Sequence, residues 1–227
     1  LLQTIKEILP NASKQWPILV VDNASTKCRK EYQEIEQLAQ SSKYLFYFRH
    51  DENLFAFGNI LSLFDLAPTQ FFTIVSDEDR PSIPALDGLS PFLRENKDIG
   101  AIQTSLGTVP GVRQLMAHGF DDLIFEKGEG VKKFGLVGNY VTGHIYNGRL
   151  LKQLNIPQRL KKNLTANRFY PHLYLNILAS ANTRTMYSST VACLEGASEP
   201  YIAGDTSRHS PSDYFGTFSY GTRIDQF

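Results

Sequence analysis

The chain has 227 residues, of which 42% are hydrophobic and 20% are charged, and its 23 basic and 23 acidic residues give a formal net charge of zero. This size fits one α/β domain with a substantial buried core, and the balanced charge offers no electrostatic basis for a nucleic-acid partner, so we expect none. No stretch approaches the ~18 consecutive apolar residues of a membrane-spanning helix, and no signal-peptide pattern is visible. The two cysteines, Cys28 and Cys193, cannot build a disulfide framework, which favours a reducing, cytoplasmic compartment.

Strand and helix patterns alternate along the first hundred residues. Four segments place apolar residues at helical spacing: 1–9, 32–39, 56–66 and 84–93. Four others are short strand-like runs: 17–21, 44–48, 71–75 and 100–104. Uninterrupted apolar strands joined by helices are typical of a sheet that is covered on both faces, so the sequence predicts an α/β fold built from right-handed βαβ units.

The pattern weakens beyond residue 107. Residues 108–135 mix Gly, Asp, Lys and aromatic side chains without a clear period, which predicts an irregular segment. A strand-like stretch over 137–146 and a helical stripe over 170–178 follow it. The second half of the chain is therefore expected to be less regular than the first.

An acidic triplet, Asp77-Glu78-Asp79, directly follows the strand-like run at 71–75. In an open α/β sheet, ligands bind beyond the carboxyl ends of the strands. Two carboxylates one residue apart at such an end can converge on Mg²⁺ or Mn²⁺, which prefer oxygen ligands and keep positions open for substrate phosphates. A solvated acidic turn is the alternative interpretation.

A second polar pair, Asp22-Asn23, follows the run at 17–21. An aspartate there can accept a hydrogen bond from a uracil-like imide or from ribose hydroxyls. Helix capping and turn formation are the alternative.

Together these segments resemble the inverting glycosyltransferases of family 2, which have the GT-A fold. Residues 18–26, Ile-Leu-Val-Val-Asp-Asn-Ala-Ser-Thr, are similar to the family's I-V-V-D-D/N-x-S-T segment. Asn53 to Asn59 resembles its N-x-G-x-x-x-x-N segment, except that Phe55 stands at the usual glycine.

The acidic triplet extends the resemblance. Asp77, Asp79 and Pro84 keep the spacing of the family's D-x-D-D-x-x-x-P motif, and the sequence departs from it at Arg80, where a further acid is frequent. The agreement covers residues 1–93, in matching order and at matching separations.

This resemblance implies a GT-A, Rossmann-like, mostly parallel sheet flanked by helices. It divides the domain into a nucleotide-sugar-binding half at 1–105 and an irregular acceptor-binding half at 106–227. The family's first strand, which ends in P-x-Y-N and contacts the nucleotide, is expected before Leu1 and is not in this sequence.

The resemblance further implies a nucleoside-diphosphate sugar as donor, with a UDP-sugar as the first choice, and Mn²⁺ or Mg²⁺ as cofactor. The metal would neutralise the departing diphosphate and would be bound by Asp77 and Asp79. The remaining expected residues of the nucleotide-sugar site are Asp22, Asn23, Asn53, Glu78, His144 and Arg149.

The catalytic base is the least defined part of the expected site. The family supplies it from an acidic pair at the start of a helix, and the corresponding helix here has no acid, so His172 stands nearest to the expected position. Histidine is suited to taking a proton from a sugar hydroxyl. Asp121 and Asp122 are rival candidates, and packing inside the protein is the alternative for His172.

The expected reaction is inverting transfer of the sugar to a hydroxyl of a glycan or lipid-linked acceptor. Membership of the family would imply bacterial surface-polysaccharide synthesis, with peripheral association at the inner face of the membrane. Two other classes stay open: a nucleotidyltransferase that forms sugar nucleotides, and a catalytically inactive glycan-binding relative.

Overall fold

A computed structural model of the chain describes residues 1–107, 112–113, 121–135, 141–162 and 171–196. The helices are α1 (Leu2–Ile8), α2 (Arg29–Ser41), α3 (Phe55–Leu66), α4 (Ile83–Glu95), α5 (Gly148–Gln153), α6 (Ile156–Lys162) and α7 (Pro171–Asn182), with short turns η1 (Leu9–Asn11) and η2 (Val131–Gly135). The strands are β1 (Ile18–Asp22), β2 (Leu45–Arg49), β3 (Phe71–Thr73), β4 (Arg80–Pro81), β5 (Ile99–Gly107), β6 (Val112–Arg113), β7 (Leu123–Phe125), β8 (His144–Asn147) and β9 (Arg184–Leu194). Within these ranges, no helix combines the length and apolarity needed to cross a bilayer.

The strands form two separate sheets. β1 and β2 pair in parallel, and a larger sheet has the order β3-β8-β5-β9-β4, with β6 paired to β5 and β7 to β9. Among the described strands of the larger sheet, β5 and β9 form the only parallel pair, and β8 runs between β3 and β5 in the opposite direction to both. The α/β class is confirmed, but the expected mostly parallel pairing is wrong for this sheet. An apolar run in the sequence reports burial on both faces and does not encode the direction of the neighbouring strand.

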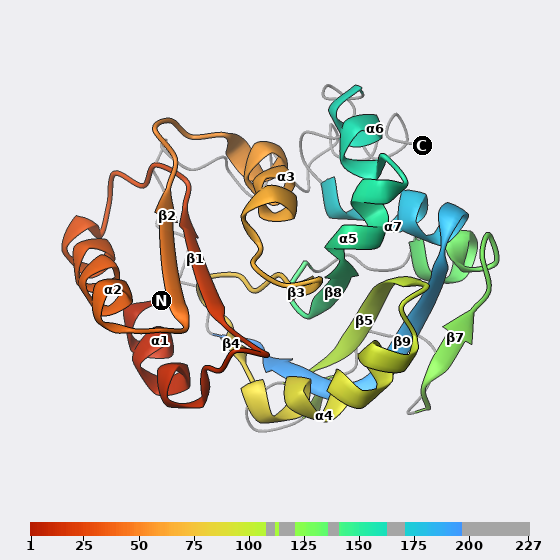
Figure 1. Ribbon diagram of the computed structural model, residues 1–227, viewed down its shortest axis with the longest axis horizontal. Coiled ribbons are helices and arrows are strands. Elements are labelled where there is room, and N and C mark those ends of the chain that lie inside the picture. The colour runs from red at the N-terminus through yellow and green to blue at the C-terminus, as the bar shows by residue number, and fades with distance from the viewer. Residues whose placement is uncertain (108–111, 114–120, 136–140, 163–170, 197–227) are drawn as a thin grey trace.

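Helices cover both faces of the larger sheet (Figure 1). Ala101 of β5 packs in a cluster with buried side chains of α3, α5, α6 and α7, whereas Ile102 packs in a second cluster with the apolar side of α4. Successive strand residues point to opposite faces, so β5 separates the two halves of the core. Because β5 spans Ile99–Gly107, the expected division between residues 105 and 106 falls inside a central strand.

The smaller sheet has its own apolar cluster. Ile5 of α1, Ile35 of α2, Val20 of β1 and Leu45 of β2 are buried together. Because Val20 and Leu45 pack in this cluster with both helices, α1 and α2 cover the same face of the strand pair, at the left of Figure 1. The parallel pairing of β1 and β2 places the loops that follow them at the same end of the sheet.

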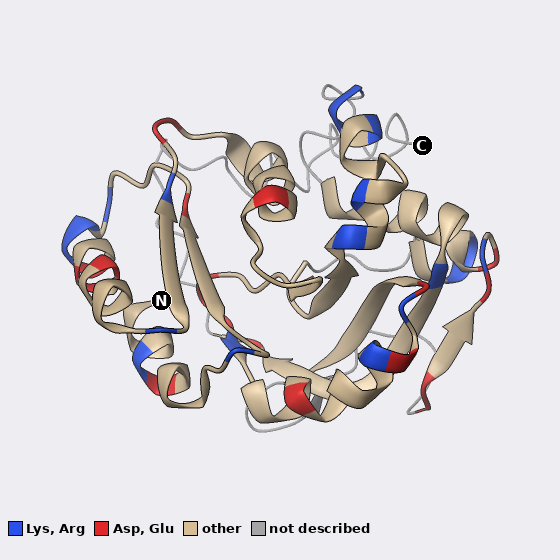
Figure 2. Cartoon of the chain, viewed as in Figure 1, with Lys and Arg blue, Asp and Glu red and all other residues tan. Residues whose placement is uncertain are grey.

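Charge is unevenly distributed although the formal total is zero. α5 and α6 carry basic residues and no acidic ones, whereas α2 mixes both signs (Figure 2). Arg149 belongs to the basic group and is exposed on α5.

Candidate functional site

The loops that follow β1 and β2 are joined by an asparagine pair. Asn23 Nδ2 donates to Asn53 Oδ1 at 2.9 Å, and Asn23 Oδ1 accepts from the Leu54 backbone at 2.9 Å. Parallel neighbours end at the same edge of a sheet, so residues thirty positions apart meet directly. The sequence expectation that Asn23 and Asn53 belong to one site is consistent with this geometry.

Phe55 begins α3 with a left-handed backbone, at φ +55°. Its N–H donates to Asn53 Oδ1 at 2.8 Å, and its carbonyl accepts from Asn23 Nδ2 at 3.4 Å. The asparagine pair thus holds Phe55 in a conformation that glycine adopts without strain, which gives a physical reason for a glycine at this position in the resembling motif.

Asp22 organises the β1 loop from inside. Its side chain is fully buried and accepts hydrogen bonds from the Ser25 backbone at 2.8 Å, from the Tyr47 hydroxyl at 2.9 Å and from the Arg49 guanidinium. Burial by itself would raise the pKa of Asp22, but the hydrogen bonds from Ser25 and Tyr47 and the charge of Arg49 outweigh it and lower the pKa. Asp22 is therefore a carboxylate engaged with protein groups, and it is Asn23 and Ser25 of this loop that line the neighbouring pocket.

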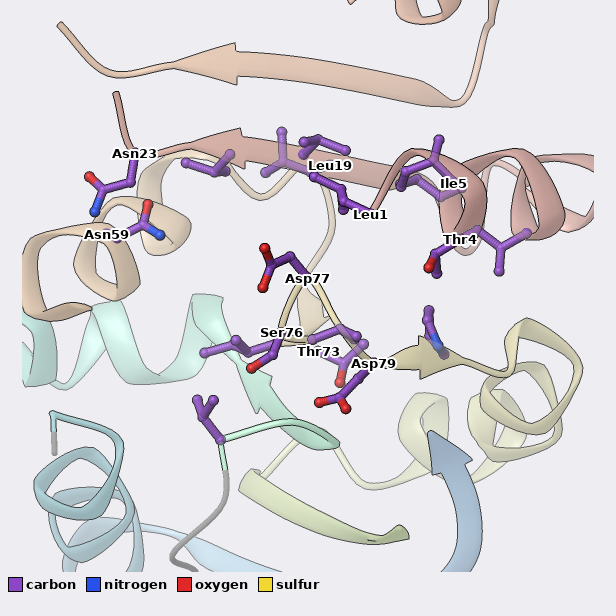
Figure 3. Close-up of a pocket in the computed structure, with 18 of the residues that line it drawn as sticks. Leu1, Thr4, Ile5, Leu19, Asn23, Asn59, Thr73, Ser76, Asp77 and Asp79 are labelled. Carbon is purple, nitrogen blue, oxygen red and sulfur yellow. The ribbon is translucent and has the colours of Figure 1, made fainter. Parts of the chain in front are cut away.

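The acidic triplet forms a tight turn after β3, closed by the Asp79 N–H bond to the Ser76 carbonyl at 3.0 Å. Asp77 and Asp79 both line the pocket, but Asp77 is exposed and points toward β1, whereas the carboxylate of Asp79 points away from β1 (Figure 3). Asp79 is only 1% exposed, and its oxygens accept from the Thr142 hydroxyl at 2.6 Å and from the Gly196 backbone at 2.9 Å.

Glu78 has a strongly perturbed carboxyl group. Desolvation, a hydrogen bond with Asp77 and repulsion from Asp77 and Asp79 raise the pKa of Glu78 to about 7. The carboxyl groups of Asp77, Glu78 and Asp79 thus lie in one turn, where the first and last repel negative charge on Glu78. A bound cation would reduce this repulsion.

A divalent cation fits this turn only in part. No group of three or more metal-ligating side chains occurs among the described residues, and the expected pair Asp77 and Asp79 does not converge. Asp77 and Glu78 are in contact at the open side of the turn and offer carboxylate oxygens there. Mg²⁺ and Mn²⁺ are commonly bound by one or two carboxylates, with the remaining positions left to water and phosphate oxygens.

A pocket of about 480 Å³ lies between β1 and the acidic turn (Figure 3). One end is apolar and is lined by α1 and β1, and the other is polar, with Asn23, Ser25, Asn59 and Asp77. This volume is in the range of small-ligand sites. Within the described part of the chain no ladder joins β1 to β3, and the strand expected before Leu1 stays a prediction.

Two polar atoms of the pocket were not anticipated from the sequence. Asn59 Oδ1 and Thr73 Oγ1 are buried without a hydrogen-bond partner among the described residues, and both side chains belong to the lining. Buried polar atoms in native structures are nearly always satisfied, so a bound group or water is the expected partner. The matching Asn59 in the family segment was the signal that could have identified this residue.

The candidates from the second half lie outside the lining of this pocket. His144 is fully buried, and its ring nitrogens face Asn176 and the Val141 carbonyl, so it is not placed to contact a diphosphate. His172 is 7% exposed and its ring lies 6.4 Å from that of His144. Both histidines are interior residues, one on β8 and the other on α7, and Asn176 of α7 contacts β8 through His144 and Tyr146.

The remaining predicted residues are exposed. Asp122 accepts from the Ser189 backbone at 2.6 Å and so holds the start of the irregular part of β9. Asp121 and Arg149 are also on the surface. As catalytic or donor-contacting groups, these three residues stay predictions.

Comparison with known proteins gives a likeness in fold. No protein-family model matches the chain, and no curated protein matches it significantly. Solved structures do match: S. aureus TarS 1–349 superposes with a TM-score of 0.62 at 17% identity, over 86% of this chain and 56% of that one. The α/β class is thereby confirmed by an experimental neighbour.

Two further TarS structures carry ligands. The complex with UDP matches with a TM-score of 0.60 at 19% identity, over 81% of this chain and 52% of that one. The complex with UDP-GlcNAc matches with a TM-score of 0.62 at 15% identity, over 99% and 62%. This chain thus spans about half the length of the TarS 1–349 structures that it resembles.

Proposed function

We propose that this protein is a glycosyltransferase that moves a sugar from a nucleoside-diphosphate donor, with a UDP-sugar as the first choice, to a hydroxyl of an acceptor. The observation that carries the proposal is the polar end of the pocket, where the loops after β1 and β2 meet the acidic turn after β3. A fold shared with structures that hold UDP and UDP-GlcNAc supports the same class of ligand.

Each part of the polar end has a proposed task. Asn23 and Ser25 of the β1 loop and Asn59 of α3 offer amide and hydroxyl groups to the nucleoside, and Asp22 keeps the β1 loop in place through Ser25 and Arg49. Asp77 and Glu78 face the diphosphate side. A bound Mn²⁺ or Mg²⁺ would supply charge neutralisation of the leaving diphosphate.

Asp79 has a proposed structural task, because its buried carboxylate holds the acidic turn in place. Its contacts with Thr142 and Gly196 tie the acidic turn to the segment before β8 and to the end of β9. Direct metal coordination by Asp79, expected from the resemblance, would use the remaining lone pairs of a carboxylate that is almost fully buried.

The acceptor side of the proposal rests on the resemblance. It includes inversion at the anomeric carbon, a base among His172, Asp121 and Asp122, and a glycan or lipid-linked acceptor at the inner face of a membrane in surface-polysaccharide synthesis. α5 and α6 carry basic side chains, Arg149 among them, in the half of the chain that the resemblance assigns to the acceptor.

Calorimetric titration of UDP, UDP-GlcNAc and GDP, each with and without Mn²⁺, tests the donor site. We expect UDP to bind with a metal-dependent affinity that falls at least about tenfold in Asp77→Ala, as is typical when a ligand to a catalytic metal is disturbed. Asp87→Ala is the matched control, because Asp87 is an exposed carboxylate on α4 outside the pocket. A folded wild-type protein that binds none of these nucleotides would contradict the proposal.

Release of UDP from UDP-GlcNAc, in the presence of acceptor mixtures, distinguishes the active enzyme from its alternatives. An inactive relative would bind the nucleotide without releasing UDP. A nucleotidyltransferase would release pyrophosphate from a nucleoside triphosphate and a sugar phosphate.

A further inference from the structure

His144 is the first residue of β8 and links two elements that are far apart in sequence. Its Nε2 lies 3.0 Å from the Asn176 amide nitrogen on α7, and its Nδ1 lies 3.3 Å from the Val141 carbonyl oxygen. His144 and Asn176 are both fully buried. A fully buried ring with a polar group at each nitrogen is held in one orientation.

The neighbouring side chains also define the tautomer of His144. The Tyr146 hydroxyl donates to Asn176 Oδ1 at 2.8 Å, and burial raises the pKa of Tyr146, so the phenol keeps its proton. The Asn176 amide lies with its Oδ1 at the Tyr146 hydroxyl and its N–H₂ at His144, so Nε2 accepts that hydrogen bond. The ring proton then resides on Nδ1, which donates to the Val141 carbonyl.

The Val141 carbonyl belongs to the turn that holds Asp79. Thr142 donates its hydroxyl to Asp79 Oδ2 at 2.6 Å and accepts the Ser76 N–H at 2.9 Å. Gly143 completes the turn with a left-handed backbone, at φ +84°, and its N–H donates to the Ile74 carbonyl at 3.0 Å. Through this hydrogen bond, Thr142 of the turn before β8 orients the buried carboxylate of Asp79.

We propose that His144 is a positioning residue for Asp79. Its Nδ1–H holds the Val141 carbonyl, this contact keeps Thr142 on Asp79, and the acidic turn then presents Asp77 and Glu78 to the diphosphate and its metal. Asn176 of α7 donates to Nε2 and so keeps the ring proton of His144 on Nδ1. This inference rests on the proposed function, because it assigns His144 a share in metal-dependent donor binding.

A pair of amide variants separates the two nitrogens of His144. The amide of Asn reaches the position of Nδ1 and can still donate to the Val141 carbonyl, whereas the amide of Gln reaches the position of Nε2 and leaves that carbonyl with only the backbone N–H of residue 144 as a donor, at 3.5 Å. His144→Asn and His144→Gln both shrink a buried ring, so both lower the free energy of unfolding. Only His144→Gln removes the contact that the inference depends on.

The readout is the ratio of the UDP dissociation constant without Mn²⁺ to that with Mn²⁺. We expect this ratio to fall about tenfold in His144→Gln, in the range found when residues that orient metal ligands are changed, and to stay near wild type in His144→Asn. Thr142→Val should give the same loss as His144→Gln. The double variant should lose little more than either single one, because both changes break the same path.

Several outcomes would overturn the inference. If a folded His144→Gln keeps the wild-type ratio of UDP dissociation constants, His144 has a purely structural role. The same conclusion follows if this ratio falls equally in His144→Asn and His144→Gln. If His144→Gln does not fold, Asn176→Leu is the second variant, and an unchanged ratio there has the same meaning. If the wild type binds UDP equally with and without Mn²⁺, the metal part of the proposed function fails as well, whereas a metal-dependent wild type with an unaffected variant removes only the role of His144.

Discussion

Asparagine side chains form hydrogen bonds in two regions of the molecule that differ in burial: the loops after β1 and β2, and a polar cluster of His144, Tyr146 and Asn176 between β8 and α7. In the loops, Asn23 and Asn53 bond to each other at the surface and leave Asn23 in the pocket lining. Beneath β8, Asn176 and His144 bond to each other in a fully buried site. The comparison shows that residue type alone does not identify a ligand-binding group, since burial decides whether its hydrogen-bonding capacity faces a ligand or the protein.

Gly196, just after β9, lies against the acidic turn, and Gly196→Ala should have the largest effect on stability. A Cβ at Gly196 would lie 1.7 Å from the Glu78 carbonyl oxygen, so the turn or the strand end must move. We expect a loss of about 3 kcal/mol in the free energy of unfolding, measured by urea denaturation. The control is Gly88→Ala in α4, where a Cβ meets nothing within 4 Å and helix propensity predicts a gain of about 1 kcal/mol. Equal changes in the two variants would show that this contact imposes no constraint.

Asp22→Asn, a change at the start of the β1 loop, should have the next largest effect on the free energy of unfolding. Replacing the buried carboxylate weakens its charged hydrogen bonds with Arg49 and Tyr47, for an expected loss of about 2 kcal/mol at pH 7. Because the pKa of Asp22 is lowered in the folded protein, its contribution is present above the ordinary value of 3.8 and is lost as the pH falls through the folded value. Urea denaturation across pH 2–7 should therefore show the wild type approaching the variant in acid. A constant difference across this range would contradict the assignment.

Phe55 offers a smaller and more local test of the loop region. Its φ of +55° disfavours any residue with a Cβ, so Phe55→Gly should be more stable than Phe55→Ala by about 1 kcal/mol. The side chain is 51% exposed, so the comparison of Gly with Ala isolates the backbone contribution from most of the lost packing. Thermal or urea denaturation measures the difference, and a more stable Ala variant would argue against the left-handed conformation.

The smallest expected effect concerns the carboxyl of Glu78. Nuclear magnetic resonance titration should report a pKa of about 7 for Glu78, and Asp77→Asn should bring it part of the way down, because desolvation remains after the repulsion is removed. Since the folded pKa is raised, this group favours folding below pH 4.5, and that contribution is lost as the pH rises through about 7. An unchanged pKa in Asp77→Asn would show that desolvation accounts for the whole shift.

Local sequence determined much of the first half of this protein. The apolar run at 17–21 and the helical spacing at 56–66 correspond closely to β1 and α3, and the polar residues after them lie in adjoining loops, as the parallel pairing of β1 with β2 requires. These predictions depend on periodicity and on neighbours a few residues apart, which a sequence displays directly.

Only the tertiary structure decided which of the polar residues face the pocket. Asp77 and Asp79 stand two positions apart in one motif, yet Asp79 turns inward because Thr142 and Gly196, 63 and 117 residues away, hold its oxygens. The antiparallel course of β8 and the burial of His144 against Asn176 likewise arise from contacts between distant segments. Sequence periodicity specifies the elements and the ends at which they stop, whereas the direction of a neighbouring strand and the partner of a buried side chain are set by long-range packing that no local pattern encodes.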